Sequence, residues 1–155
     1  SIAIHPIHGQ DTGAGWLRLT PVSRLVLGIA PDDLPRVLPL AGQEIRLEGR
    51  CIALGDPHTR LLDPAASLHS RLVTLGEDAD EPRFLAEIAR ELFSLEIRGE
   101  LALRTRRALR ILDQTLMGFA VTVRGLSAED SVHLQEAGLG AWRKLGAGVF
   151  TPALG

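Results

Sequence analysis

From residue 71 onward, the apolar residues follow two periods in an order that sharply limits how the chain can fold. Apolar residues at every second position predict strands, at 71–75, 101–111, 117–124 and 149–151. Helices are predicted after Asp80 and Ser127, whose side chains can accept hydrogen bonds from a helix N-terminus. Leu85, Ile88 and Leu92 form the expected apolar face of the first helix. The order strand, helix, strand, strand, helix, strand is that of an α+β ferredoxin-like unit.

Residues 1–70 follow the same order with its beginning missing. We predict extended segments and one short helix there, with strands at 2–7, 16–20, 23–29 and 44–54 and the helix at 34–40. The chain is therefore expected to hold tandem ferredoxin-like units, a partial one at 1–70 that lacks its initial strand and helix and a complete one at 71–155. Two elements of ordinary length need about 40–50 residues, which we expect to precede Ser1. The alternative is a genuinely short domain whose uncovered sheet edge is closed by a partner.

Charge is divided unevenly along the 155 residues. Residues 1–97 hold nine Arg against fourteen Asp and Glu, whereas residues 98–155 hold eight basic against five acidic side chains. The net charge of −2 is thus −5 in the first part and +3 in the second, and sixteen of the seventeen basic residues are arginine. Guanidinium groups bind phosphate in a bidentate manner and stack on bases, which suits RNA. A genome-wide codon bias is the other explanation for the arginine excess.

Composition also excludes several classes of protein. Cys51 is the only cysteine, so there is no disulfide framework and no cysteine-rich zinc site. The carboxylates are scattered, and we expect neither a bound metal nor a cofactor. No apolar run approaches the ~18–20 residues that cross a bilayer. We therefore expect a soluble cytoplasmic protein with no membrane partner.

The segment at 101–111 is rich in arginine. Three of these arginines occupy even positions and would share one face of a strand, namely Arg104, Arg106 and Arg110. Arg124 joins this face from the returning strand, and Arg107 breaks the alternation at a bulge or at the rim. Arginines gathered without nearby acids favour phosphate binding, and a solvated edge strand is the alternative.

A glycine-rich segment lies between the last helix and the last strand. It surrounds the basic pair Arg143 and Lys144 with Gly138, Gly140, Gly146 and Gly148. Glycine permits a positive φ and close backbone approach, so consecutive N–H groups could bind a phosphate. The alternative is a structural cap and bulge that joins helix to strand. Trp142 in this segment either stacks on a base or fills the core.

His5 and His8 are the candidate catalytic residues. An odd spacing places them on opposite faces of a strand, which argues against a shared metal. A single imidazole beside a phosphate can act as a general base or acid near neutral pH.

Three segments resemble the C-terminal signature of the CRISPR repeat-processing endoribonucleases of the RAMP superfamily. They are SAEDS at 127–131, LQEAGLG at 134–140 and RKLGAGVFTP at 143–152. One branch of that family is also similar at IHPIHG (4–9), at 61–74 and at 104–110 followed by Gly118-Phe119. The superfamily is built from tandem ferredoxin-like units.

The resemblance implies metal-independent cleavage of precursor CRISPR RNA to a 2′,3′-cyclic phosphate, with the glycine-rich segment and the arginine strand binding the repeat stem-loop. It also implies that the protein stays on the 3′ stem-loop of the guide RNA, with other subunits of a ribonucleoprotein effector complex for antiviral defence. In the family, the general-base histidine lies on the first helix of the first unit, an element that this pattern lacks. His5 or His8 are the candidates to replace it. The alternatives are a non-catalytic RAMP subunit that only binds guide RNA, and a ferredoxin-like ligand or oligomerisation module.

Overall fold

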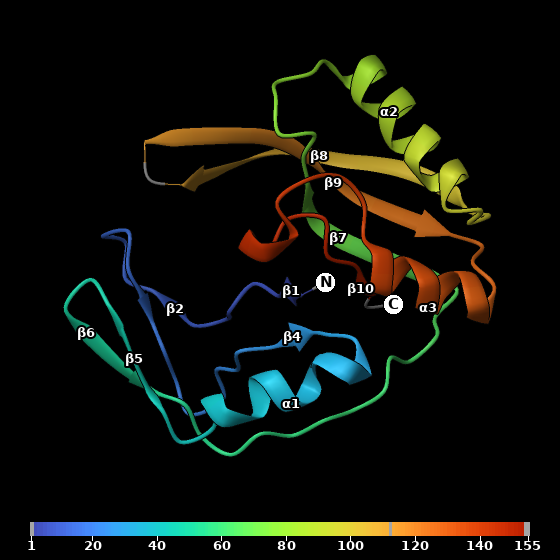
Figure 1. The fold of residues 1–155 in the computed structure, drawn as a ribbon. Helices are drawn as coiled ribbons and strands as arrows, with labels where there is room; N and C mark the ends of the chain where they lie inside the picture. Colours follow the sequence, from blue (N-terminus) through green and yellow to red (C-terminus); the bar gives the residue numbers. More distant parts are fainter. Residues whose placement is uncertain (1, 112, 154–155) are drawn as a thin grey trace.

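The second part of the chain forms one antiparallel sheet with two helices packed on a single face (Figure 1). In the computed structural model, which describes residues 2–111 and 113–153, the strand order in this sheet is β10-β7-β9-β8. The elements are β7 (Ser67–Val73), α2 (Glu81–Ser94), β8 (Glu100–Ile111), β9 (Gln114–Arg124), α3 (Ala128–Ala137) and β10 (Thr151–Pro152). The predicted ferredoxin-like order of elements is therefore present, although its first strand begins at Ser67, ahead of the predicted 71.

Both helices begin at the predicted capping residues. The Asp80 carboxylate accepts a hydrogen bond from the Arg83 amide at 2.9 Å, and the Ser127 hydroxyl accepts one from the Asp130 amide at 3.0 Å. These bonds satisfy amides that have no partner within the helix.

The buried face of α2 differs from the prediction by one residue. Phe84, Ile88 and Leu92 point into the core, whereas Leu85 is 40% exposed. The helix is turned toward Phe84 because this larger ring packs against Phe119 of β9, with ring centroids 4.8 Å apart. Leu85 as a core residue was therefore a wrong prediction.

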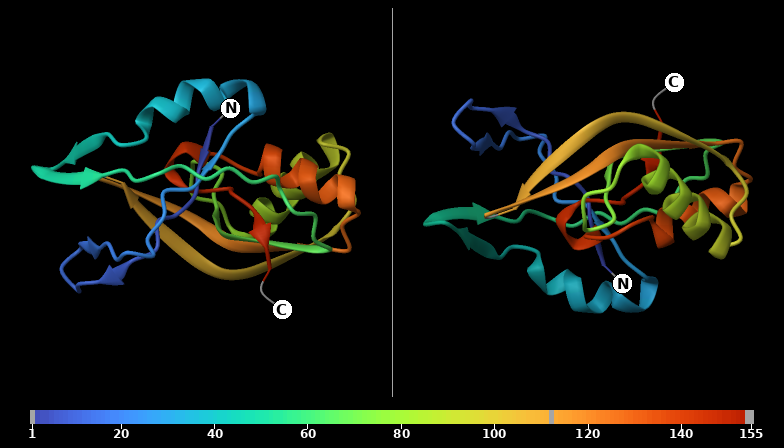
Figure 2. Two further views of the ribbon diagram at one scale, coloured as in Figure 1. Left: turned by 90° about the horizontal axis from the view of Figure 1, so that it is seen from below. Right: turned by 90° about the horizontal axis from the view of Figure 1, so that it is seen from above.

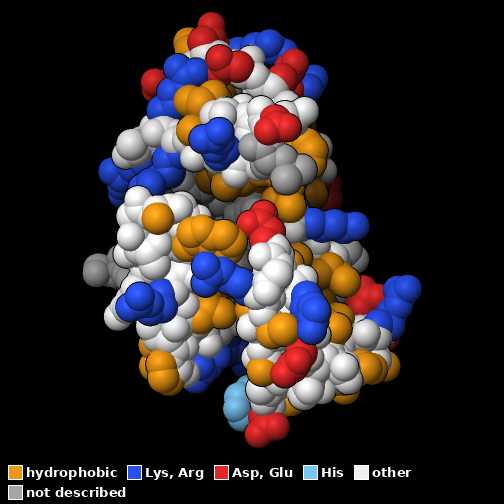
Figure 3. All heavy atoms as spheres, turned by 90° about the vertical axis from the view of Figure 1, so that its left-hand side faces the viewer, with side chains coloured by type: hydrophobic (Ala, Val, Ile, Leu, Met, Phe, Trp, Pro, Cys, Tyr) orange, Lys and Arg blue, Asp and Glu red, His pale blue; other side chains and the backbone are white. Residues whose placement is uncertain are grey.

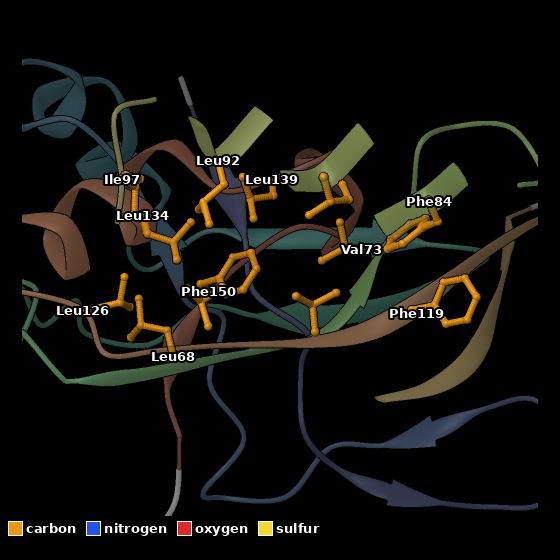
Figure 4. Close-up of a cluster of buried hydrophobic side chains, with 13 residues drawn as sticks. Leu68, Val73, Phe84, Leu92, Ile97, Phe119, Leu126, Leu134, Leu139 and Phe150 are labelled. Carbon is orange, nitrogen blue, oxygen red and sulfur yellow. The ribbon is translucent and has the colours of Figure 1, made fainter. Parts of the chain in front are cut away.

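The core lies between the sheet and the two helices (Figure 4). The sheet contributes residues such as Leu68 and Val73, and α3 contributes Leu134. Leu139 and Phe150, from the two ends of the glycine-rich segment, are also fully buried there (Figure 4). The segment that connects α3 to β10 is thus anchored in the core at both ends.

Residues 2–66 form small ladders instead of one sheet. The pairs are β1 (Ala3–Ile4) with β4 (Leu27–Gly28), β2 (Gln10–Asp11) with β3 (Leu17–Arg18), and β5 (Glu44–Leu47) with β6 (Arg50–Ala53). Short helical turns at Pro31–Asp33, α1 (Leu34–Val37) and Leu38–Leu40 precede β5. Within the described part of this region, Ala3 is the one buried hydrophobic residue. A partial ferredoxin-like unit at 1–70 therefore stays a prediction.

The arrangement in space brings the ends of three hairpins to one side of the molecule. The β2–β3, β5–β6 and β8–β9 hairpins project toward the same end in both Figure 1 and the left view of Figure 2. The N-terminal residues lie on the side of the sheet opposite α2 (Figure 1). None of the described helices is long and apolar enough to cross a bilayer.

Candidate functional site

A bulge divides β8 into two parts with opposite alternation. Leu103 lies opposite Val121 of β9, whereas Arg106 lies opposite Phe119. Three steps along β8 therefore match two along β9, which places one extra residue at 104–105. Beyond that point, the residues that face the helices and those that face away exchange positions.

This bulge separates arginines that the sequence predicted to lie together. Directly opposed residues in an antiparallel pair share a face. Arg106 therefore shares the helix-covered face with Phe119, and its guanidinium forms a 2.8 Å ion pair with Asp78 before α2. Arg110, four residues further along the same strand, lies on that face too. The prediction of a common face for Arg104, Arg106 and Arg110 is wrong, because the bulge lies at 104–105 and not at Arg107.

A different set of arginines gathers on the other side of the sheet. Arg107 lies opposite Gly118, which places it on the face away from the helices. His69 of β7 lies on the same face, opposite Thr122. Burial lowers the pKa of His69, and so do the positive charges of Arg107, Arg104 and Arg71, whereas a hydrogen bond with the Val121 backbone raises it; the three arginines therefore lie near this ring. We call Arg71, Arg104 and Arg107, all of them exposed, the basic face.

Arg124 lies apart from the basic face. It is opposite Glu100 near the end of β9, six residues from Gly118. At about 3.4 Å per residue, that separation is about 20 Å along the strand.

A hollow of about 370 Å³ lies where the basic face, the glycine-rich segment and the N-terminal residues meet. Arg71, Arg106 and Arg107 contribute from the sheet, Leu145 and Gly146 from the glycine-rich segment, and Pro6 from the N-terminal region. Figure 3 shows Lys and Arg side chains on both the upper and the lower part of the molecule, as seen from the left-hand side of Figure 1. Residues far apart in the sequence thus form one concave, positively charged surface.

The glycine-rich segment is fastened to the sheet by its own backbone. The amide of Gly148 donates to the Leu72 carbonyl at 2.7 Å, and that of Ala141 donates to the Thr74 carbonyl at 2.8 Å. The amides of residues 139, 140, 145, 146 and 147 also donate within the protein. These bonds occupy both ends of the segment, whereas the consecutive amides of Trp142, Arg143 and Lys144 have no hydrogen-bond acceptor within the described structure. The structural alternative thus describes the two ends, and phosphate binding by the amides at 142–144 stays a prediction.

Close backbone approach explains two of the glycines. Gly148 has φ +66°, and a Cβ added there would collide with the Leu139 carbonyl oxygen. A Cβ on Gly138, also at φ +66°, would collide with the Gly148 carbonyl oxygen and lie 2.6 Å from Nε of Arg143. These positions let the two ends of the segment and the Arg143 side chain lie together.

The side chains of this segment differ in how accessible they are to a ligand. Arg143 is half-buried, and burial lowers its pKa; its Nε is buried and has no hydrogen-bond partner within the described structure. Lys144 is exposed. Trp142 is 44% exposed and lies over Gly76. Of the two alternatives for this side chain, the one in which it fills the core is therefore wrong.

The two candidate histidines occupy different environments. His5 is half-buried, and burial first, then the charges of Arg60 and Arg143, lower its pKa, so its ring is neutral at pH 7. His8 is exposed, and its backbone carbonyl accepts a 2.7 Å hydrogen bond from the Ser23 hydroxyl. Of the two, His5 lies beside the glycine-rich segment. Among the described residues, no group of three or more His, Cys, Asp or Glu side chains could hold a metal ion.

Sequence reasoning missed Arg71 and His69 as part of this surface. Both lie on β7, whose neighbours in the sheet are β9 and β10, and neither belongs to an arginine-rich run. Knowledge of the strand order would have been needed to bring them next to Arg104 and Arg107.

Comparison with known proteins identifies the family. The sequence profile described as Cas6 Crispr matches residues 1–155. A Myxococcus xanthus (strain DK1622) protein named CRISPR-associated endonuclease Cas6 is 40% identical over 121 residues, which are 78% of this chain and 53% of that protein. The chain thus spans about half the length of this curated relative.

Two solved Cas6 structures are more distant. A point mutant is 17% identical with a TM-score of 0.42, over 99% of this chain and 84% of that one. A complex with a substrate mimic is 21% identical with a TM-score of 0.41, over 97% and 84%. Such scores are too low to transfer positions from either structure. The match of the profile along the whole sequence confirms the resemblance seen in its motifs: the chain belongs to the Cas6 family.

Proposed function

We propose that this chain binds CRISPR repeat RNA and cleaves precursor CRISPR RNA without a metal ion, leaving a 2′,3′-cyclic phosphate. The observation that supports this most strongly is the hollow at which the basic face, the glycine-rich segment and the N-terminal residues meet. We further propose that the product stays bound through its 3′ stem-loop while the protein serves in an effector complex. The curated relative's name, an endonuclease, agrees with an RNA-processing activity.

Cleavage by an RNA's own 2′-hydroxyl makes three demands on the protein. The hydroxyl must lie in line with the scissile phosphate, its proton needs an acceptor, and the charge that builds up on the phosphate needs stabilisation. His5 is the better candidate acceptor, because its lowered pKa leaves a neutral imidazole at pH 7. Arg143, which is close enough to His5 to affect that pKa, would stabilise the charged phosphate together with Lys144. His8 is the second candidate.

The other proposed contacts with RNA are assigned from where the side chains lie around the hollow. Arg104 and Arg107, joined by Arg71, bind RNA phosphates along the open face of the sheet, and Trp142 stacks on a base. The glycines at 138, 140, 146 and 148 hold the wall that presents these side chains. Arg124 extends the contact toward the far end of β9. Arg106 and Arg110 share the helix-covered face by register. Arg106 also lines the hollow, but its guanidinium is paired with Asp78, so neither arginine is assigned to this RNA path.

Incubation with repeat RNA in EDTA tests the proposal. The expected product ends in a 2′,3′-cyclic phosphate, which acid treatment opens to a 2′(3′)-monophosphate. His5→Ala should slow single-turnover cleavage far more than His8→Ala, and His133→Ala, an exposed residue of α3, is the matched control. RNA that is bound but intact would favour a non-catalytic guide-binding subunit. An absence of RNA binding would favour a ligand or oligomerisation module.

A further inference from the structure

His69 occupies the middle of the open face of the sheet. It lies opposite Thr122 of β9 on one side and Thr151 of β10 on the other. Its Nδ1 is 3.2 Å from the Thr122 hydroxyl oxygen, a hydrogen-bond distance that fixes the orientation of the ring. The side chain is half-buried but remains in contact with solvent. The ring is therefore held in place on the same face as the basic face.

The charges around this ring are positive. Those that act on its pKa belong to Arg107 and Arg104 from β8 and to Arg71 from its own strand. Among the residues that the structure describes, none of these three guanidiniums lies within ion-pair distance of a carboxylate. The neighbours on β9 and β10 are uncharged threonines.

The acidic residue that β8 places on this face is Glu100. It lies two residues beyond Ala102, which is opposite Thr122, and directly opposite Arg124. Within the described structure, the three arginines and the imidazole have no carboxylate within ion-pair distance. Burial and these charges lower the pKa of His69, so the ring is neutral at pH 7 in the free protein.

A phosphodiester bound on this face would act on the pKa of His69 in the opposite direction. Its negative charge offsets the guanidiniums, and its oxygens can accept a hydrogen bond from a protonated imidazole. An opposite charge within hydrogen-bond distance favours the charged form of a titrating group. We propose that His69 is an RNA-phosphate contact of this surface and takes up a proton when the RNA binds.

This inference rests on the proposed RNA binding, and it predicts the direction in which the affinity for RNA changes with pH. Because the bound state holds more protons than the free state, affinity rises as the pH falls through the range between the two pKa values. Uptake of one full proton gives at most about a tenfold gain in affinity per pH unit. If the imidazole of His69 stayed neutral when RNA binds, its contact would add no such gain in affinity at lower pH.

Binding of a non-cleavable repeat RNA, with hydrogen in place of the attacking 2′-hydroxyl, tests this by fluorescence anisotropy from pH 5.5 to 8.0 at constant ionic strength. The wild type should bind several-fold more tightly at the acid end. In His69→Gln, which keeps a polar side chain but does not titrate, that gain should be lost. His133→Gln, at an exposed position of α3, is the control and should keep it.

NMR provides a second readout that does not depend on the affinity. The imidazole C–H resonance that disappears in His69→Gln should titrate at a higher pH in the RNA complex than in the free protein. An unchanged titration, or a His69→Gln variant that keeps the full pH dependence, would refute the role of His69 and leave RNA binding intact. A wild type that binds no RNA at any pH would refute both proposals.

Discussion

The bulge gives β8 two faces that carry arginines, and two double variants test separately whether each face binds RNA. One double variant, Arg104→Gln with Arg107→Gln, removes two charges from the basic face. The matched variant, Arg106→Gln with Arg110→Gln, removes two charges from the same strand but from the helix-covered face. Net charge, strand and residue type are the same in both, so the variants differ in the direction of the side chains and in the ion pair between Arg106 and Asp78.

The expected magnitudes follow from counterion release. Each phosphate contact of a single strand contributes about 0.7 to the slope of log K against log salt concentration. Loss of two contacts should lower that slope by about 1.4 and weaken binding about 25-fold at 0.1 M salt. Arg106 already pairs with Asp78, so the matched variant should change affinity less than about twofold, and an exposed pair of this kind stabilises the fold by about 0–1 kcal/mol.

Anisotropy titrations of the non-cleavable repeat RNA between 50 and 300 mM KCl would measure both slopes (about a sixfold range, wide enough to resolve a change of one contact). Circular dichroism of each variant controls for folding. Equal losses of slope in the two double variants would refute the argument, because the face on which an arginine lies would then have no bearing on RNA binding. A larger loss in the Arg106 and Arg110 variant would refute it as well.

Three further outcomes concern stability and are measured by urea unfolding. Gly148→Ala should destabilise the protein by about 2–4 kcal/mol, since the added Cβ meets the Leu139 carbonyl in left-handed backbone; Gly125→Ala, at φ +69° in open space, should cost only about 1 kcal/mol. Phe119→Ala should cost about 3–5 kcal/mol, because it empties a buried ring site against Phe84. The folded pKa of His69 lies below its unfolded value, so the unfolded chain binds more protons and stability should fall between pH 7 and pH 5; His69→Gln should make this fall shallower, and an unchanged slope would contradict it.

The elements of the second unit were predictable because their signals are local. Asp80 and Ser127 cap their helices through hydrogen bonds within three residues, as their positions before the apolar periods indicate. Gly138 ends α3 with a positive φ for the same local reason. Local chemistry was enough to place these boundaries, and from them the order of strands and helices followed.

The arrangement of the arginines was not predictable, because it depends on a partner strand. A bulge is a difference in residue count between two paired strands, and nothing in the residues of β8 alone shows it. One extra residue turned Arg106 toward the helices and brought Arg107 to the open face. The bonds that fasten the glycine-rich segment were not predictable for a similar reason, since the amides of Gly148 and Ala141 donate to Leu72 and Thr74 of another part of the chain.

The hydrogen bonds that fasten the glycine-rich segment determine which of its groups can contact a ligand. With Leu139 and Phe150 buried at its ends, the segment is anchored in the core on both sides. Trp142 has φ +68°, a left-handed conformation that costs a residue with a Cβ about 1–2 kcal/mol. The turn is held there because the Trp142 carbonyl accepts hydrogen bonds from the amides of Leu145 and Ala147. This strained turn holds the exposed indole of Trp142 directly before Arg143 and the exposed Lys144, in the segment that lines the hollow, whereas Nε of Arg143 is itself buried.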